Sequence, residues 1–157
     1  MTPKGLLRLK GASSTLSDLA EGRFQPVLDD PAAQFERVTK LVITSGKLYY
    51  DIAGHGLRSQ ARHVAVARLE QLYPFPVEAT ARLVASYPAL EEVVWAQEEP
   101  QNMGAWRPIR HRLEEAVSGL PLGYAGRPWR ASPSEGYPTS HAREQDRIVR
   151  EVLVPAG

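Results

Sequence analysis

Residues 93–106 read Val-Val-Trp-Ala-Gln-Glu-Glu-Pro-Gln-Asn-Met-Gly-Ala-Trp, and this stretch decides the fold. The apolar run 93–96 predicts the end of a buried strand, and the Pro/Asn/Gly turn after it leads into a helix. Two adjacent carboxylates, Glu98 and Glu99, close the strand. Because burying a charge is costly unless it is paired, we expect both at a ligand-binding edge or at an interface.

Three further apolar runs share this plan of a strand that turns into a helix. The predicted strands are 41–44, 64–67, 93–96 and 122–125, and the predicted helices are 48–57, 76–87, 104–117 and 140–153. Continuous apolar strands separated by helices indicate a mainly parallel sheet that is covered on both faces. We therefore predict a three-layer α/β domain with right-handed crossovers.

The first 35 residues predict an extended N-terminal arm. Prolines interrupt this region, and we expect its one amphipathic piece, residues 16–20, to be capped by Ser13 or Ser14 and ended by Gly22. The arm is basic, which fits either a solvated face or an anion site; its cations are Lys4, Arg8, Lys10 and Arg23. The chain is thus divided into an arm, residues 1–35, and an α/β domain, residues 36–157.

Polar clusters follow each predicted strand. In parallel α/β sheets, ligands and partners meet the carboxyl ends of the strands, so we expect the four clusters to lie along one edge of the domain. The clusters are Ser45, Gly46 and Lys47; Glu70, Gln71 and Tyr73; Glu98, Glu99 and Asn102; and Arg127 and Arg130.

Two of these clusters resemble catalytic or phosphate-binding motifs. Ser45-Gly46-Lys47 precedes a helix and fits a phosphate cradle, but it is too short for a P-loop, and we favour a plain strand-to-helix turn. Glu98 and Glu99 fit a general acid and base, yet no nucleophile, metal ligand or cofactor motif accompanies them. We favour an interface or internal ion pairing for these carboxylates and predict no catalytic residue in this chain.

Arg127 and Arg130 lie in a Gly/Pro/Ser-rich loop, residues 126–138. An arginine presents a bidentate fork that suits carboxylates and phosphates. These side chains therefore bind an anionic ligand or pair with Glu98 or Glu99 across the edge of the sheet.

The composition excludes several classes of protein. A net charge of +1 gives no indication of nucleic-acid or anionic membrane binding. The chain has no cysteine, and its four histidines lack the spacing of a metal site, so we predict no metal site. No apolar segment reaches the roughly 20 residues of a membrane span. We expect a soluble intracellular protein.

Several motifs, in order along nearly the whole chain, resemble a known family. They are residues 2–8, 22–27, 45–51, 70–76, 97–106 and 124–128, with 131–133 after them. Together they are similar to the C-terminal, transketolase C-terminal-like domain of the thiamine-dependent dehydrogenase component of the 2-oxoglutarate dehydrogenase complex. One departure is Gly5, where the family has Ser. The sequences of residues 70–76 and 98–106 disfavour a relative of the pyruvate or branched-chain dehydrogenases.

The resemblance implies a longer parent that decarboxylates 2-oxoglutarate on thiamine diphosphate and magnesium and passes succinyl to a lipoyl-carrying succinyltransferase. None of the family's cofactor-binding motifs lies in this segment, so we expect no turnover from it alone. The resemblance is compatible with the bacterial cytoplasm and with the mitochondrial matrix, and we favour the bacterial cytoplasm.

Two hypotheses for the segment's own function follow. In the first, the strand-end edge and the arm pack against the parent's other domains and the second subunit of a homodimer. In the second, a regulatory site formed by Ser45, Lys47, Arg127 and Arg130 binds a nucleotide or an acyl-CoA.

Overall fold

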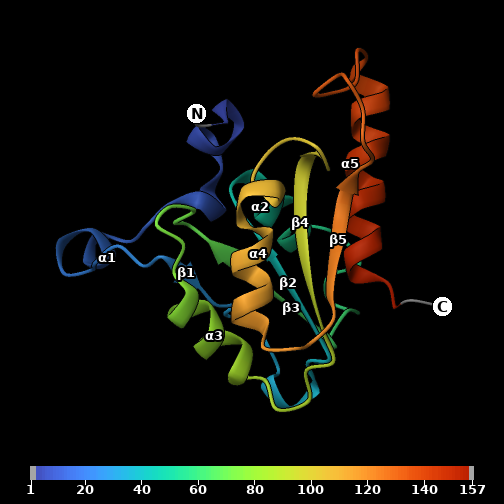
Figure 1. The fold of residues 1–157 in the computed structure, drawn as a ribbon. Helices are drawn as coiled ribbons and strands as arrows, with labels where there is room; N and C mark the ends of the chain where they lie inside the picture. Colours follow the sequence, from blue (N-terminus) through green and yellow to red (C-terminus); the bar gives the residue numbers. More distant parts are fainter. Residues whose placement is uncertain (1–2, 156–157) are drawn as a thin grey trace.

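The computed structural model describes residues 3–155, which form a five-stranded sheet with helices on both faces (Figure 1). The strands lie in the order β1-β3-β2-β4-β5. Their bounds are β1 (Val27–Leu28), β2 (Lys40–Thr44), β3 (Val64–Leu69), β4 (Glu92–Pro100) and β5 (Leu122–Arg127). Strands β2 to β5 are parallel. The predicted mainly parallel α/β fold is confirmed and is consistent with a transketolase C-terminal-like domain.

Strand β1 was not predicted, because two residues are too few to show a period. It runs antiparallel to β3, with Val27 opposite Leu69. The carbonyl oxygen of Pro26 extends this pairing by accepting hydrogen bonds from the backbone N–H groups of Glu70 and Gln71, at 2.9 and 3.2 Å. The arm is therefore joined to the sheet before residue 35, and the domain boundary placed there stays a prediction.

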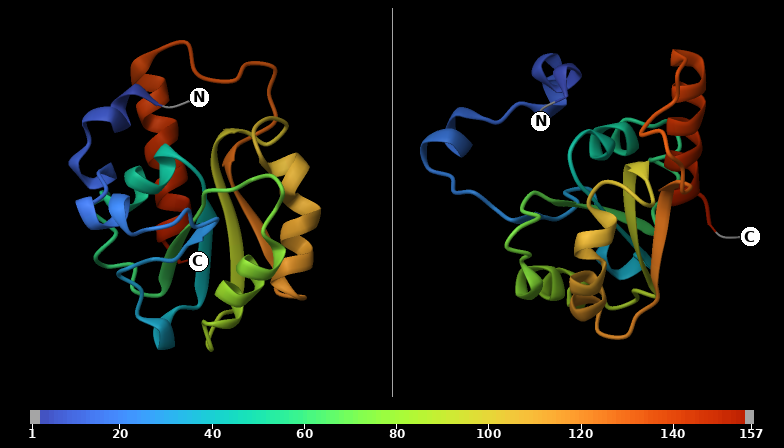
Figure 2. Two further views of the ribbon diagram at one scale, coloured as in Figure 1. Left: turned by 90° about the vertical axis from the view of Figure 1, so that its left-hand side faces the viewer. Right: turned by 45° about the horizontal axis from the view of Figure 1, so that its top comes forward.

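Two pairs of helices form the outer layers of the fold. Helices α2 (Lys47–Ala53) and α5 (Pro138–Leu153) pack on one face, and α3 (Val77–Ala85) and α4 (Trp106–Val117) pack on the other. The left view in Figure 2 shows the sheet between the two pairs. Each face has its own apolar cluster, and Trp95, fully buried, lies on the α3/α4 side.

The short helix of the arm, α1 (Leu16–Ala20), is capped by Thr15 and not by Ser13 or Ser14. The Thr15 hydroxyl accepts from the backbone N–H of Asp18 at 3.1 Å, and the Asp18 carboxylate accepts from the backbone N–H of Thr15 at 3.0 Å. This reciprocal capping box fixes the start of the helix, because it satisfies two N–H groups that have no partner within the helix.

Several predicted helix boundaries differ from the structure, and two of the differences have a clear physical reason. Helix α5 begins at Pro138 and not after Ser140. Proline suits the first turn of a helix because N–H groups there have no acceptor within the helix, so the absence of an N–H in proline loses no hydrogen bond. Helix α2 ends at Ala53 rather than at residue 57, and it is followed by Gly54, whose low helix propensity favours an end there.

The arm lies away from the four helices that cover the sheet (Figures 1 and 2). It contains the 3₁₀ helices η1 (Lys4–Arg8) and η2 (Lys10–Ala12), then α1, and a third 3₁₀ helix, η3 (Phe35–Arg37), precedes β2. None of residues 3–25 is buried. Within residues 3–155, no helix combines the length and apolar character needed to cross a membrane.

Candidate functional site

The predicted polar clusters lie at one edge of the sheet, where the parallel strands β2, β3, β4 and β5 end. Strand β2 leads into α2 on one face, whereas β4 leads into α4 on the opposite face. A change of face between neighbouring strands opens a crevice at their carboxyl ends, which is the usual ligand position in such sheets. The stretch 97–106 therefore borders this crevice.

Glu98 belongs to the α2/α5 side of the edge. Its carboxylate lies 3.1 Å from Nζ of Lys47 and accepts a hydrogen bond from Nε2 of Gln145 at 2.9 Å. The same Gln145 nitrogen donates to Asp51 at 2.7 Å, and Asp51 also pairs with Lys47. Burial opposes the charged form of Lys47, but the two carboxylates together raise its pKa above the ordinary value. This group therefore joins α2 to β4 by an ion pair and joins α5 to both by hydrogen bonds from Gln145.

Glu99 points to the α3/α4 side, because successive side chains of a strand alternate between faces. It lines a cleft of about 850 Å³ with Trp95, Gln97 and α4 residues such as Ile109. Within residues 3–155, the Glu99 carboxylate has no hydrogen bond or ion pair. Glu98 and Glu99 are therefore separated by the sheet, and they do not form the acid and base pair that their adjacency had allowed.

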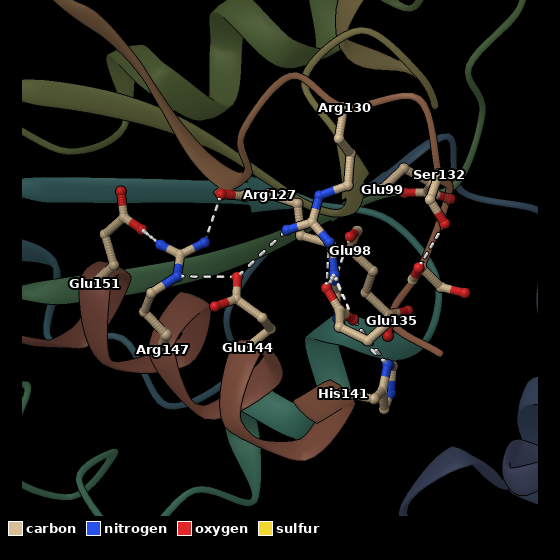
Figure 3. A network of polar contacts seen from close by, with 12 residues as sticks. Glu98, Glu99, Arg127, Arg130, Ser132, Glu135, His141, Glu144, Arg147 and Glu151 are labelled. Carbon is tan, nitrogen blue, oxygen red and sulfur yellow. Dashed lines mark hydrogen bonds and ion pairs between the residues drawn. The ribbon is translucent and has the colours of Figure 1, made fainter. Parts of the chain in front are cut away.

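Arg127 is almost fully buried and binds Glu135 in the loop after β5. Its Nε lies 2.9 Å from one carboxylate oxygen and its Nη2 lies 2.8 Å from the other. Figure 3 shows the two side chains facing each other. The hydrogen bonds from Arg127 lower the pKa of Glu135 to about 2, so this carboxylate stays charged. Arg127 also donates to the backbone oxygen of Glu98.

Arg130 binds the same carboxylate, with Nη1 2.6 Å from Glu135. Its backbone is held by Asn102, whose side-chain amide donates to the Arg130 carbonyl at 3.0 Å and accepts from the Arg130 N–H at 3.2 Å. The predicted pairing of Arg127 and Arg130 with the side chains of Glu98 or Glu99 is wrong. Glu98 is already bound to Lys47, Glu99 faces the opposite side, and Glu135 returns to the arginines from the loop.

A chain of ion pairs continues from this loop along α5 (Figure 3). Arg147 is 3.2 Å from Glu144 and 2.8 Å from Glu151, and it donates to the carbonyl of Gly126 at 2.8 Å. His141, half exposed, lies 3.6 Å from Glu135. These contacts hold the loop and α5 against the end of β5.

The remaining predicted site residues lie in the turn before α2 and in the loop after β3. Gly46 has a φ of 67°, a conformation that favours glycine, and it precedes α2, while Ser45 lines the cleft. Glu70 lies 3.6 Å from Arg68, and Gln71 donates from Nε2 to the carbonyl of Pro74 at 2.6 Å. This geometry matches a plain turn at Ser45 and Gly46 and a braced loop after β3.

Comparison with known protein families identifies the family of this chain. Residues 13–153 match the model of the 2-oxoglutarate dehydrogenase C-terminal family. The chain belongs to this family. The resemblance drawn from the motifs is therefore confirmed, and the matched range includes all five strands and helices α1 to α5.

Three bacterial relatives are named 2-oxoglutarate dehydrogenase E1 component. The chain is 48% identical to the Bacillus subtilis protein over 158 residues, which covers 98% of this chain and 17% of that protein. It is 46% identical to the Cupriavidus necator protein over 151 residues, covering 95% and 16%. It is 44% identical to the Azotobacter vinelandii protein over 158 residues, covering 98% and 17%. The chain thus spans about one sixth of the length of these relatives.

Gln97 is a residue of this 2-oxoglutarate dehydrogenase C-terminal domain that the sequence analysis missed. It is buried, and its Oε1 accepts from the indole N–H of Trp95 and the backbone N–H of Trp106, both at 2.9 Å. Its Nε2 faces the carbonyls of Glu99, Pro100 and Met103 at 2.8–3.2 Å. Gln97 therefore holds the turn from β4 to α4 in one conformation. The available signal was the spacing: a polar residue two positions after a buried tryptophan in a strand lies on the same buried face.

Asp30 was also missed, because it lies in the region assigned to the arm. It is buried, pairs with Arg58, and accepts a hydrogen bond from the backbone N–H of Val66 at 2.8 Å. Arg58 in turn donates to the carbonyls of Ala61 and Val64, each at 3.1 Å. This pair fixes the chain before β2 against β3.

The described part of the C-terminal domain contains no group of three or more His, Asp or Glu side chains placed to hold a metal ion. The carboxylates of the strand-end edge divide instead into those bound to internal cations, Glu70, Glu98 and Glu135, and the unpaired Glu99.

Proposed function

We propose that this chain is the C-terminal assembly domain of a 2-oxoglutarate dehydrogenase E1 component. The parent would decarboxylate 2-oxoglutarate on thiamine diphosphate and magnesium and pass succinyl to a lipoyl-carrying succinyltransferase, while this segment alone has no turnover. The names of the relatives and the one-sixth share of their length support this assignment. Because these relatives are bacterial, we place the parent in the cytoplasm.

The observation that carries the assembly function is the exposed apolar surface of the arm. Five large apolar side chains of the arm are solvent-exposed in the isolated segment: Leu7, Leu9, Leu16, Leu19 and Phe24. Short helices such as those of the arm are marginal in water unless an apolar face packs against another surface. The arm therefore packs on the other domains of the parent or on the second subunit of a homodimer.

The geometry disfavours a regulatory anion site at the residues predicted for it. Lys47 already binds Asp51 and Glu98, and Arg127 and Arg130 already bind Glu135. A nucleotide or acyl-CoA would have to displace these carboxylates. Assembly is the function that leaves the internal ion pairs intact.

The test removes residues 1–157 from the full-length protein and measures its mass in solution and its turnover of 2-oxoglutarate. Loss of the dimer together with loss of turnover is the expected result. An unchanged dimer with unchanged turnover contradicts the proposal, and an unchanged dimer with an altered response to nucleotides or acyl-CoA supports the regulatory function instead.

A matched pair of variants separates the arm from the domain. Changing both Leu16 and Leu19 to Ser removes apolar side chains that nothing in residues 3–155 covers, so the fold of the segment is retained while the dimer weakens. The control changes Ser14 and Ser17 to Ala, which leaves the apolar side chains in place. Equal dimer stability in the two double variants would remove the arm from the interface.

A further inference from the structure

The cleft beside Glu99 is open toward solvent and has apolar walls. Its floor is Trp95, and α4 contributes Pro108 and Ile109. The loop after β3 forms the rim with Leu72, which is 39% exposed, and Tyr73, which is 93% exposed. A cavity of this size, lined by apolar side chains with a few polar groups, is typical of a binding site.

The floor of the cleft is held rigid by contacts around the backbone of Glu99. The Glu99 carbonyl accepts hydrogen bonds from Nε2 of Gln97 at 3.2 Å and from the hydroxyl of Tyr124 at 3.1 Å. Burial raises the pKa of Tyr124 to about 12, which keeps this donor protonated. Gly104, with a φ of 66°, allows the turn to approach, since a Cβ there would lie 3.0 Å from Cβ of Glu99. The cleft therefore exists before anything binds.

Within residues 3–155, the carboxylate of Glu99 forms no ion pair, and His111 and Arg112 line the same cleft. The arginine that also lines it, Arg112, is bound to Glu115 at 3.1 Å. Glu98, the neighbour of Glu99 in the chain, is by contrast bound to Lys47. A carboxylate fixed beside apolar walls favours an occupant that combines an apolar body with a positive charge.

We infer that the cleft binds a polypeptide segment of the parent that lies outside residues 1–157 and carries an apolar residue next to a lysine or arginine. Charge complementarity to Glu99 and the apolar walls set this chemistry. The relatives contain ample further chain, since this segment covers 16–17% of their length. Lysine and arginine also have apolar stems that pack on such walls. The inference rests on the proposed assembly function and identifies the cleft as one of the contacts through which the domain assembles.

The test labels carboxylates of the full-length protein with a carbodiimide and a small amine, followed by mass spectrometry of peptides. Glu91, which is exposed and directly precedes the start of β4, is the reference residue. We expect labelling of Glu99 to be at least about tenfold slower than that of Glu91 in the full-length protein, because an ion pair with a covering segment excludes the reagent. Equal labelling of the two residues would overturn the inference.

A charge reversal provides a second, independent readout. Glu99→Lys in the full-length protein places two positive charges together, and we expect proteolytic cleavage between residues 20 and 35 to become about tenfold faster as the domain detaches. Glu91→Lys is the control and leaves the rate unchanged. If removing residues 1–157 abolishes the dimer but Glu99→Lys behaves like Glu91→Lys, the cleft contact is wrong and the assembly function stands. If removal has no effect on the dimer, the assembly function itself falls.

Discussion

Glu98 and Glu99 are neighbours in sequence but lie in opposite environments. The side chain of Glu98 is 28% exposed and shares Lys47 and Gln145 with Asp51, whereas Glu99 is exposed on the wall of an open cleft. The α2/α5 side of the edge is closed by internal ion pairs, whereas on the α3/α4 side Glu99 lines an open cleft and forms no ion pair within residues 3–155. The difference teaches that one strand end can present an internally paired carboxylate on one face of the sheet and an exposed, unpaired one on the other.

The largest loss of stability is expected from removing the charge of Glu135 on the α2/α5 side of the sheet edge. Glu135→Gln leaves Arg127, whose side chain is 1% exposed, without its anion, and we expect the free energy of unfolding to fall by about 3–5 kcal/mol. Urea unfolding of the chain measures this change. Glu151→Gln, which alters an exposed ion pair on α5, is the control and should cost no more than about 0.5 kcal/mol.

The second largest loss of stability is expected from replacing Gln97, which lies beside the cleft on the α3/α4 side. Gln97→Met keeps the volume but leaves the indole N–H of Trp95 and the N–H of Trp106 without their acceptor, so we expect a loss of about 2–3 kcal/mol. Gln101→Met, at a partly exposed position of the same turn, should be nearly neutral. Comparable losses in both variants would show that Gln97 does not hold the turn.

The pH dependence of stability should also come from the closed side. The pKa of Glu135 is lowered to about 2 from its ordinary 4.5, chiefly by Arg127, so its contribution is fully present above pH 4.5 and is lost as the pH falls toward 2. Thermal unfolding temperatures measured between pH 5 and pH 2.5 should therefore fall more steeply for the wild type than for Glu135→Gln. Parallel curves would contradict the assignment of this pKa.

The smallest effects compare the two glutamates directly. Glu98→Gln weakens a partly exposed ion pair with Lys47 and should cost about 0.5–1 kcal/mol, a loss that salt reduces. Glu99→Gln should change the stability of the isolated chain by less than about 0.3 kcal/mol, because no internal partner is lost. Chemical denaturation at low and high salt measures both. A larger cost at Glu99 would mean that its carboxylate has an internal partner.

Most of the fold was predictable because the deciding signals are local. The continuous apolar runs at 41–44, 64–67, 93–96 and 122–125 all became parallel strands, and the resemblance of the motifs gave the family. The start of α5 was misplaced because Pro138 competes with Ser140 as a start signal. Strand β1 was missed because only its pairing with β3 makes it a strand.

The candidate site was predictable in outline only. Parallel strands bring the four polar clusters to one edge, and strand alternation alone separates Glu98 from Glu99. The partner of Arg127 could not be read from the sequence, because Glu135 reaches it through an irregular loop. The buried pair of Asp30 and Arg58 was hidden for the same reason, since 28 residues separate its members.

The most direct test of the division between the two faces is the carboxylate labelling of this chain on its own. Glu99 should react with carbodiimide and amine about as fast as the exposed Glu91, while Glu98, bound by Lys47 and Gln145, should react several times more slowly. Equal rates at Glu98 and Glu99 would contradict the account, because the two carboxylates would then share one environment.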